Sequence, residues 1–277
     1  MSSKPSTMPP DPVAPDTALH TWPSRGDGPP LVLAHGFTQT GRVWGTMDTD
    51  LAADHRVIAV DMPGHGRSAG VTASLTQGAE LLGRAGGRAA YLGYSMGARF
   101  CLHLALAHPE LVDALVLISG TAGIDEPDER GERRRADEVL AEQLDPTGGP
   151  PSSAVTVEGF LRRWTEKPMF AGIGPEASGL EERLVNTGPG LASSLRLAGT
   201  GTQLPLWGDL ANLEMPVLVV TGARDEKFTV LGRRLVDAIG ANSTLVVVPD
   251  TGHAPHLQQP GQVAAVVRAH LIGATPG

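Results

Sequence analysis

Three residues far apart in the sequence have the types that catalysis by a serine hydroxyl requires. They are Ser95 within Gly-Tyr-Ser-Met-Gly, Asp225 within Gly-Ala-Arg-Asp, and His253 within Thr-Gly-His. A histidine activates the hydroxyl by accepting its proton, and a carboxylate holds that histidine in the required tautomer. The three residue types therefore predict a Ser-His-Asp triad, provided that the fold brings them together.

The residues on either side of Ser95 predict a sharp turn between two regular elements. An apolar run that ends at Tyr91-Leu92 is typical of a buried strand, and residues 96–107 have the pattern of a helix that stops at His108-Pro109. A serine between two glycines at such a turn is typical of a nucleophile elbow. The chain has 35 glycines, so the motif without this context would also fit an idle serine in a glycine-rich turn.

The remaining elements predict an α/β fold with a mostly parallel sheet. Apolar runs of strand length lie at 31–34, 57–60, 114–118, 217–221 and 244–248, and helices are expected at 75–85, 230–239 and 262–271. This alternation predicts helices on both faces of the sheet. Asp225 and His253 each follow a strand, as Ser95 does. Alone, Asp225 could be a turn residue and His253 a loop histidine, but three matching strand ends favour the triad.

The sequence divides into three kinds of segment. Residues 1–17 are rich in proline, serine and aspartate and are expected to form a disordered tail. Residues 18–121 and 209–277 are expected to form the α/β core. Residues 122–208 have no convincing strand, only helical pieces at 128–140, 158–164 and 181–197 and a Pro/Gly break at 146–151. We expect this segment to be a helical cap over the strand ends, where ligands bind in such folds.

Composition and missing motifs narrow the function classes. A net charge of −8 argues against nucleic acid or an anionic membrane as the main partner, although it permits a small acidic ligand. Cys101 is the single cysteine, so no intrachain disulfide is expected, and its place in a predicted helix favours a buried thiol. No apolar run has the length of a membrane span, and residues 1–16 lack the apolar core of a signal peptide, so a soluble cytoplasmic protein is expected. No metal or cofactor motif is present, and the oligomeric state is left open.

Over its ordered length the chain resembles the α/β-hydrolase family. The sequence His35-Gly36-Phe37 is similar to the oxyanion-hole loop of that family, which implies the backbone N–H groups of Phe37 and Met96 as oxyanion donors. His35 is expected to brace the loop. Within the family, the chain resembles the 2-succinyl-6-hydroxy-2,4-cyclohexadiene-1-carboxylate synthases. The motifs that carry this narrower resemblance are 35–38 (HGFT), 93–99 (GYSMGAR), 222–228 (GARDEKF), 252–256 (GHAPH), and, in the expected cap, 132–137 (ERRRAD), 160–164, 168–171 (PMFA) and 190–195 (GLASSL).

The narrower resemblance implies a lyase of menaquinone biosynthesis on a hydrolase fold. Such an enzyme removes a ring proton from 2-succinyl-5-enolpyruvyl-6-hydroxy-3-cyclohexene-1-carboxylate and eliminates pyruvate. The resemblance further implies Arg99, Arg133 and Arg183 as ligands of the substrate carboxylates, and Tyr94 and Trp164 as walls of the pocket. Ala98 departs from the family, which commonly has a second glycine there.

The residues alone leave other interpretations open. Arg99 could pair on the elbow helix, and Arg133 lies in a run of arginines among acids that would also suit a solvated helix face. The alternative function is a carboxylester or carbon–carbon bond hydrolase with the same triad. A non-catalytic binding module is a more distant alternative, which the intact Ser95, Asp225 and His253 argue against.

Overall fold

The computed structural model describes residues 14, 17–147 and 154–274. The predicted tail at 1–17 therefore lies almost entirely outside the described residues, as does most of the Pro/Gly break at 146–151.

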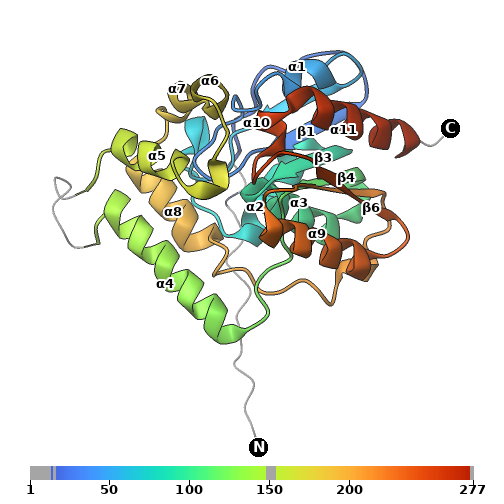
Figure 1. The fold of residues 1–277 in the computed structure, drawn as a ribbon. Coiled ribbons are helices and arrows are strands. Elements are labelled where there is room, and N and C mark those ends of the chain that lie inside the picture. Colours follow the sequence, from blue (N-terminus) through green and yellow to red (C-terminus); the bar gives the residue numbers. More distant parts are fainter. Residues whose placement is uncertain (1–13, 15–16, 148–153, 275–277) are drawn as a thin grey trace, which may run out of the picture.

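A six-stranded parallel sheet forms the centre of the molecule (Figure 1), with the strand order β2-β1-β3-β4-β5-β6. Its short apolar strands match the predicted runs. Their bounds are β1 Pro30–Ala34, β2 Arg56–Val60, β3 Ala89–Tyr94, β4 Val112–Ile118, β5 Val217–Gly222 and β6 Ser243–Val248. The expected fold class, a parallel α/β sheet with helices on both faces, is confirmed.

Helices cover both faces of this sheet, and each face has its own apolar core. On one face lie α2 (Leu75–Gly86), α3 (Met96–Ala107) and α9 (Glu226–Ile239), and on the other α1 (Met47–Leu51), α10 (Pro255–Gln258) and α11 (Pro260–Ala274). Along β1, Leu31 and Leu33 face one core while Val32 and Ala34 face the other. Successive side chains of a strand point to opposite faces of the sheet. Because both faces of this sheet are buried, the side chains on both must be apolar.

A group of helices lies between β4 and β5 in the sequence and to one side of the sheet in Figure 1. Its members are α4 (Pro127–Leu144), α5 (Val157–Thr165), α6 (Pro175–Ser178), α7 (Leu180–Arg183) and α8 (Gly188–Ala198). Phe160, Leu144 and Leu191 belong to a separate apolar cluster that joins α4, α5 and α8. The group of helices therefore has an apolar core of its own. Burial of each such side chain contributes about 1.5–3 kcal/mol to the free energy of unfolding.

Two of the differences between the predicted and the observed helices have a local cause. The segment 181–197 is two helices rather than one, because Thr187 caps α8 by accepting a hydrogen bond from the Gly190 N–H at 3.2 Å. Helix α9 begins at Glu226 instead of residue 230, because Asp225 caps it through a hydrogen bond from the Phe228 N–H at 3.3 Å. In both places a side-chain cap decided where the helix starts.

The turn between β3 and α3 explains why glycines flank Ser95. Ser95 has φ 51° and ψ −103°, a strained conformation for a residue with a side chain. A Cβ on Gly97 would lie 1.9 Å from the carbonyl oxygen of Ala34, and one on Gly93 would lie 2.5 Å from the Ala98 nitrogen. Because the obstacles are backbone atoms, only glycine fits at either position. The predicted nucleophile-elbow geometry is present.

We expect Gly97→Ala to lower the free energy of unfolding by about 3 kcal/mol, because the added methyl group meets a backbone carbonyl that cannot move aside. Gly261→Ala is the matched control, since apart from its chain neighbours and the nearby backbone of α11 no described heavy atom lies within 4 Å of its added Cβ. Urea unfolding of both variants measures the difference. Equal stability of the two variants would contradict this description of the elbow.

Over residues 17–147 and 154–274, no helix combines the length and hydropathy needed to cross a membrane.

Candidate active site

The three residues of the predicted triad lie within hydrogen-bonding distance of one another. His253 Nε2 is 3.1 Å from Ser95 Oγ, and His253 Nδ1 is 2.7 Å from Asp225 Oδ2. His253 is almost fully buried, and the ring of Phe228 packs against it at 4.4 Å between centroids. This geometry lets Nδ1–H donate to the carboxylate while Nε2 accepts the serine proton.

Asp225 is fixed from two sides. One carboxylate oxygen accepts from His253, and the other accepts from the Phe228 N–H and so caps α9. An acidic side chain is a favourable cap at a helix N-terminus, so α9 and the triad share one anchored residue. The histidine is thereby held by a group that the fold itself holds in place.

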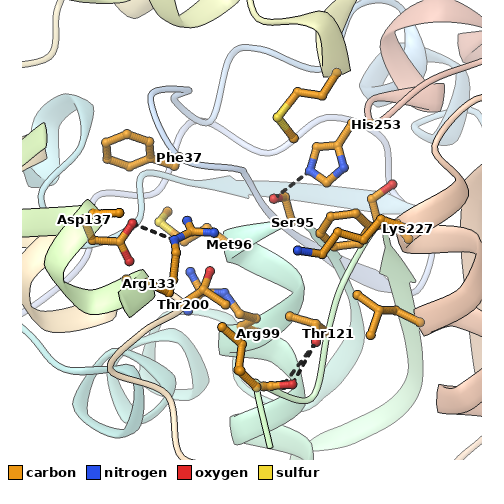
Figure 2. A pocket seen from close by; sticks show the side chains of 18 of the residues that line it. Phe37, Ser95, Met96, Arg99, Thr121, Arg133, Asp137, Thr200, Lys227 and His253 are labelled. Atoms are coloured by element: carbon orange, nitrogen blue, oxygen red, sulfur yellow. Dashed lines mark hydrogen bonds and ion pairs between the residues drawn. The ribbon is translucent and has the colours of Figure 1, made fainter. Parts of the chain in front are cut away.

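The two predicted oxyanion donors border the same cavity as Ser95. Met96 is the first residue of α3, and the first N–H groups of a helix have no partner within it. Phe37 lies in the loop after β1, and its ring packs against Trp164 at 5.0 Å between centroids. Figure 2 shows Phe37 and Met96 on the side of the cavity opposite His253.

A cavity of about 680 Å³ opens over Ser95 and His253. It is walled by α4, α5 and α8 on one side and by α3 and α9 on the other. Its cationic side chains are Arg99, Arg133, Lys167, Lys227 and Arg234. Three of its carboxylates already have partners in the described residues: Asp225 with His253, Asp137 with Arg133, and Asp125 with Arg234. Two more, Glu126 and Glu129, lie exposed at the start of α4.

Arg99 extends from α3 into this cavity (Figure 2) and is 6% exposed. Burial, followed by the nearby charge of Arg133, lowers the pKa of its guanidinium to about 10, so it stays protonated at neutral pH. Its Nη1 is buried and finds no hydrogen-bond partner among the described residues. A buried donor without a partner costs free energy that an anionic ligand would recover.

Arg133 enters from α4, and its Nε donates to Asp137 Oδ1 at 2.9 Å. The side chain is 42% exposed, whereas Asp137 is 2% exposed. The buried carboxylate holds the guanidinium stem, so the outer nitrogens remain available to the cavity. Arg133 is thus exposed on α4, as its sequence context allowed, and it also borders the cavity.

Two lysines also border the cavity, and the sequence reasoning did not propose them. In Figure 2, Lys227 and Arg133 enter from opposite sides, with Ser95 between them. Lys227 forms no ion pair with the described residues. It lies two positions after Asp225, within the 222–228 motif of the family resemblance. Lys167 lies 3.6 Å from the ring centroid of Trp164, which keeps its ammonium group at the cavity wall.

Tyr94 and Arg183 require a correction, because neither lines the large cavity. Tyr94 is the last residue of β3 and points to the opposite face of the sheet, where its ring lies 4.3 Å from that of His256. Arg183 is 4% exposed and donates to Thr38 Oγ1. Both border a separate hollow of about 20 Å³, which is too small for a substrate. Trp164, Arg99 and Arg133 do line the large cavity.

Two buried histidines support the loop that contains Phe37. Burial lowers the pKa of His35 to about 4 and that of His65 to about 3, so both are neutral. His35 Nε2 accepts from the Met62 N–H at 2.9 Å, and His65 Nε2 accepts from the Thr38 N–H at 3.1 Å. His35 thus braces the loop, as predicted.

We expect His65→Gln to flatten the pH dependence of stability. Below the ordinary histidine pKa of 6.5 the unfolded chain binds a proton that the folded chain excludes down to about pH 3, so the free energy of unfolding falls as the pH falls. One such residue contributes a slope of about 1.4 kcal/mol per pH unit, which the variant should lose. Urea unfolding between about pH 6.5 and pH 4.5 measures the slope. An unchanged slope would show that folded His65 takes up the proton.

Among the described residues, no cluster of three or more histidine, cysteine, aspartate or glutamate side chains is arranged to hold a metal ion. Cys101 is buried, as predicted, and burial raises its pKa.

The fold and the Ser-His-Asp geometry define the class of protein. The chain belongs to the alpha/beta hydrolase family, whose model matches residues 31–266. It is an enzyme of this family, as the sequence predicted.

Particular relatives are similar over most of the chain. A Bacillus subtilis (strain 168) protein, provisionally named 2-succinyl-6-hydroxy-2,4-cyclohexadiene-1-carboxylate synthase, is 32% identical over 87% of this chain and 89% of its own length. The structure of MenH from S. aureus matches with a TM-score of 0.81 and 27% identity, over 93% of this chain and 99% of that chain. A pimeloyl-acyl-carrier-protein methyl ester esterase of Pectobacterium carotovorum subsp. carotovorum (strain PC1) is 31% identical over 86% of this chain and 93% of its own length. The resemblance drawn from the motifs is confirmed.

Proposed function

We propose that this enzyme eliminates pyruvate from 2-succinyl-5-enolpyruvyl-6-hydroxy-3-cyclohexene-1-carboxylate and forms 2-succinyl-6-hydroxy-2,4-cyclohexadiene-1-carboxylate, a step of menaquinone biosynthesis. The observation that carries the proposal is the set of cations around Ser95. Arg133 enters the cavity from α4 on one side, and Arg99 and Lys227 enter from α3 and α9 on the other. The substrate bears three carboxylates, and a cavity with several cations suits such a polyanion.

In the proposed reaction Ser95 acts as the base. His253 accepts the serine proton, and the resulting alkoxide-like oxygen removes the ring proton next to the succinyl carbonyl. Electrons move through the ring double bond, the carbon–oxygen bond to the enolpyruvyl group breaks, and the diene forms. Protonated His253 returns a proton to the departing enolpyruvate, which becomes pyruvate, so both residues end as they began.

Negative charge develops on the succinyl carbonyl oxygen when the ring proton leaves. The N–H groups of Phe37 and Met96 are the proposed donors to that oxygen, and one such donor is typically worth about 3 kcal/mol of activation free energy. Asp225 keeps His253 in the tautomer that accepts the serine proton. Trp164 forms part of the cavity wall beside Phe37.

The same triad also supports a second candidate, hydrolysis of a carboxylic ester. The similarity to the methyl ester esterase favours it, since that protein is 31% identical to this chain. An esterase forms an acyl-enzyme on the serine, whereas the proposed elimination forms no covalent bond to Ser95.

Intact-mass measurement during turnover separates the two functions. With the cyclohexene substrate we expect unmodified protein at every time point while pyruvate accumulates. A p-nitrophenyl ester is the control, because its acyl group on Ser95 would be detected by the same method. A succinyl or other acyl adduct on Ser95 formed from the cyclohexene substrate would contradict the proposal.

The proposal includes a small polycarboxylate as the partner and a cytoplasmic location. The single cysteine, which is buried, is consistent with a reducing compartment.

A further inference from the structure

The loop after β1 contains a strained residue next to a proposed oxyanion donor. Thr38 has φ +69°, which is unfavourable for a β-branched residue, and its side chain is fully buried. Such strain persists only where the surroundings hold the residue in place. Thr38 follows Phe37 directly, so whatever holds Thr38 also sets the direction of the Phe37 backbone.

Hydrogen bonds occupy all three polar groups of Thr38. Its N–H donates to His65 Nε2 at 3.1 Å, its carbonyl oxygen accepts from Asn186 Nδ2 at 2.9 Å, and its hydroxyl accepts from Arg183 Nη1 at 2.5 Å. Two of the three partners come from the stretch 183–186, about 145 residues away in the sequence, at the end of α7 and before α8.

Both long-range partners are anchored themselves. Arg183 Nε donates to the carbonyl oxygen of Ser178 at 2.8 Å. Asn186 Oδ1 accepts from the Gly66 N–H at 2.8 Å, and its Nδ2 also donates to the carbonyl oxygen of Arg183 at 2.9 Å. Arg183 and Asn186 are 4% and 5% exposed. Hydrogen bonds are stronger in such dry surroundings, and a misplaced partner there is costly.

We infer that Arg183 and Asn186 are positioning residues: they hold Thr38 so that the Phe37 N–H is aimed at the oxyanion formed above Ser95. This inference rests on the oxyanion-hole part of the proposed function. It gives Arg183 a different task from the carboxylate binding that the resemblance implied. The buried guanidinium in the small hollow is consistent with this task, because it lies outside the substrate cavity.

The test measures how fast Ser95 reacts with a fluorophosphonate, in which the serine oxygen displaces fluoride at phosphorus. The phosphoryl oxygen then occupies the oxyanion hole, so the rate needs Ser95, His253 and the two N–H donors but no particular substrate. We expect Asn186→Leu to slow labelling at least about tenfold, since loss of a whole oxyanion donor costs about 100- to 1000-fold. Asn242→Leu is the matched control: Asn242 also donates to two backbone carbonyls, at 2.7 and 2.8 Å, but far from the site. Asn242→Leu should lose about as much stability as Asn186→Leu, yet its Ser95 should be labelled within about threefold of the wild-type rate.

A milder pair of variants covers the case in which Asn186→Leu fails to fold. Thr38→Val keeps the β-branch but removes the acceptor of Arg183, and Thr38→Ser keeps the hydroxyl. We expect slow labelling for the valine variant and nearly wild-type labelling for the serine variant. Wild-type rates for both Thr38→Val and a folded Asn186→Leu would overturn the inference.

Arg183→Gln separates positioning from carboxylate binding. Positioning predicts a lower kcat and slower labelling, with KM for the cyclohexene substrate within about threefold of wild type. Normal labelling with a KM raised more than about tenfold would overturn the inference and restore Arg183 as a carboxylate ligand. If the wild-type enzyme releases no pyruvate, the proposed function fails, while the labelling rates still decide this inference.

Discussion

Ser95→Ala is expected to lower the rate of pyruvate release by about a thousandfold or more, while the dissociation constant of the cyclohexene substrate changes little. The variant removes the oxygen that lies 3.1 Å from His253 Nε2 and is the proposed proton acceptor. It leaves the cations that bind the substrate in place. Single-turnover kinetics measures the chemical step, and calorimetric titration of the inactive variant measures binding.

Ser119→Ala is the matched control for this experiment. Ser119 borders the same cavity, and its buried hydroxyl has no hydrogen-bond partner among the described residues. Its loss should change turnover by no more than about threefold. Pyruvate release by Ser95→Ala at the rate of this control would remove Ser95 from the mechanism.

Arg133→Ala is expected to lower kcat/KM for the cyclohexene substrate by about 10- to 100-fold, because a hydrogen bond to a charged group is worth about 1.5–3 kcal/mol. A neutral p-nitrophenyl ester has no carboxylate for Arg133 to bind, so the variant should hydrolyse it at almost the wild-type rate. The kcat/KM of Arg133→Lys for the cyclohexene substrate should lie between those of the wild type and Arg133→Ala, since lysine keeps the charge but not the planar pair of donors. Steady-state kinetics on both substrates gives the comparison.

Arg162→Ala controls for the loss of an ion pair in the same group of helices. Arg162 pairs with Glu158 at a spacing of four residues, as Arg133 pairs with Asp137, but it does not border the cavity. Equal losses on the charged and neutral substrates in Arg133→Ala would point to structural damage by the unpaired, buried Asp137, and would contradict a role in substrate binding.

Much of the fold and the triad could be predicted from the sequence, because local patterns specify them. Buried parallel strands are short continuous apolar runs, and the glycines around Ser95 mark a turn in which only glycine fits. The polar residue that follows each strand then falls at one edge of the sheet. For that reason Asp225 and His253 could be assigned together although 28 residues separate them.

The directions of individual side chains were harder to predict. Tyr94 adjoins Ser95, yet the alternation along β3 turns its ring to the other face of the sheet, a point that the family resemblance obscured. Arg183 is directed by a partner about 145 residues away, and no local pattern reports such a contact. Lys227 lies within the 222–228 motif, but its sequence context offered no reason to assign it a role. The structure shows that it borders the cavity with Ser95.

The central claim is that this cavity eliminates pyruvate from a polycarboxylate. The measurement that tests it most directly is the rate of pyruvate release from freshly prepared 2-succinyl-5-enolpyruvyl-6-hydroxy-3-cyclohexene-1-carboxylate, beside hydrolysis of a neutral p-nitrophenyl ester by the same enzyme sample. The account predicts rapid pyruvate release with one diene formed per pyruvate, and kcat/KM for the ester lower by at least about a thousandfold. Brisk ester hydrolysis without pyruvate release would contradict it and favour the esterase.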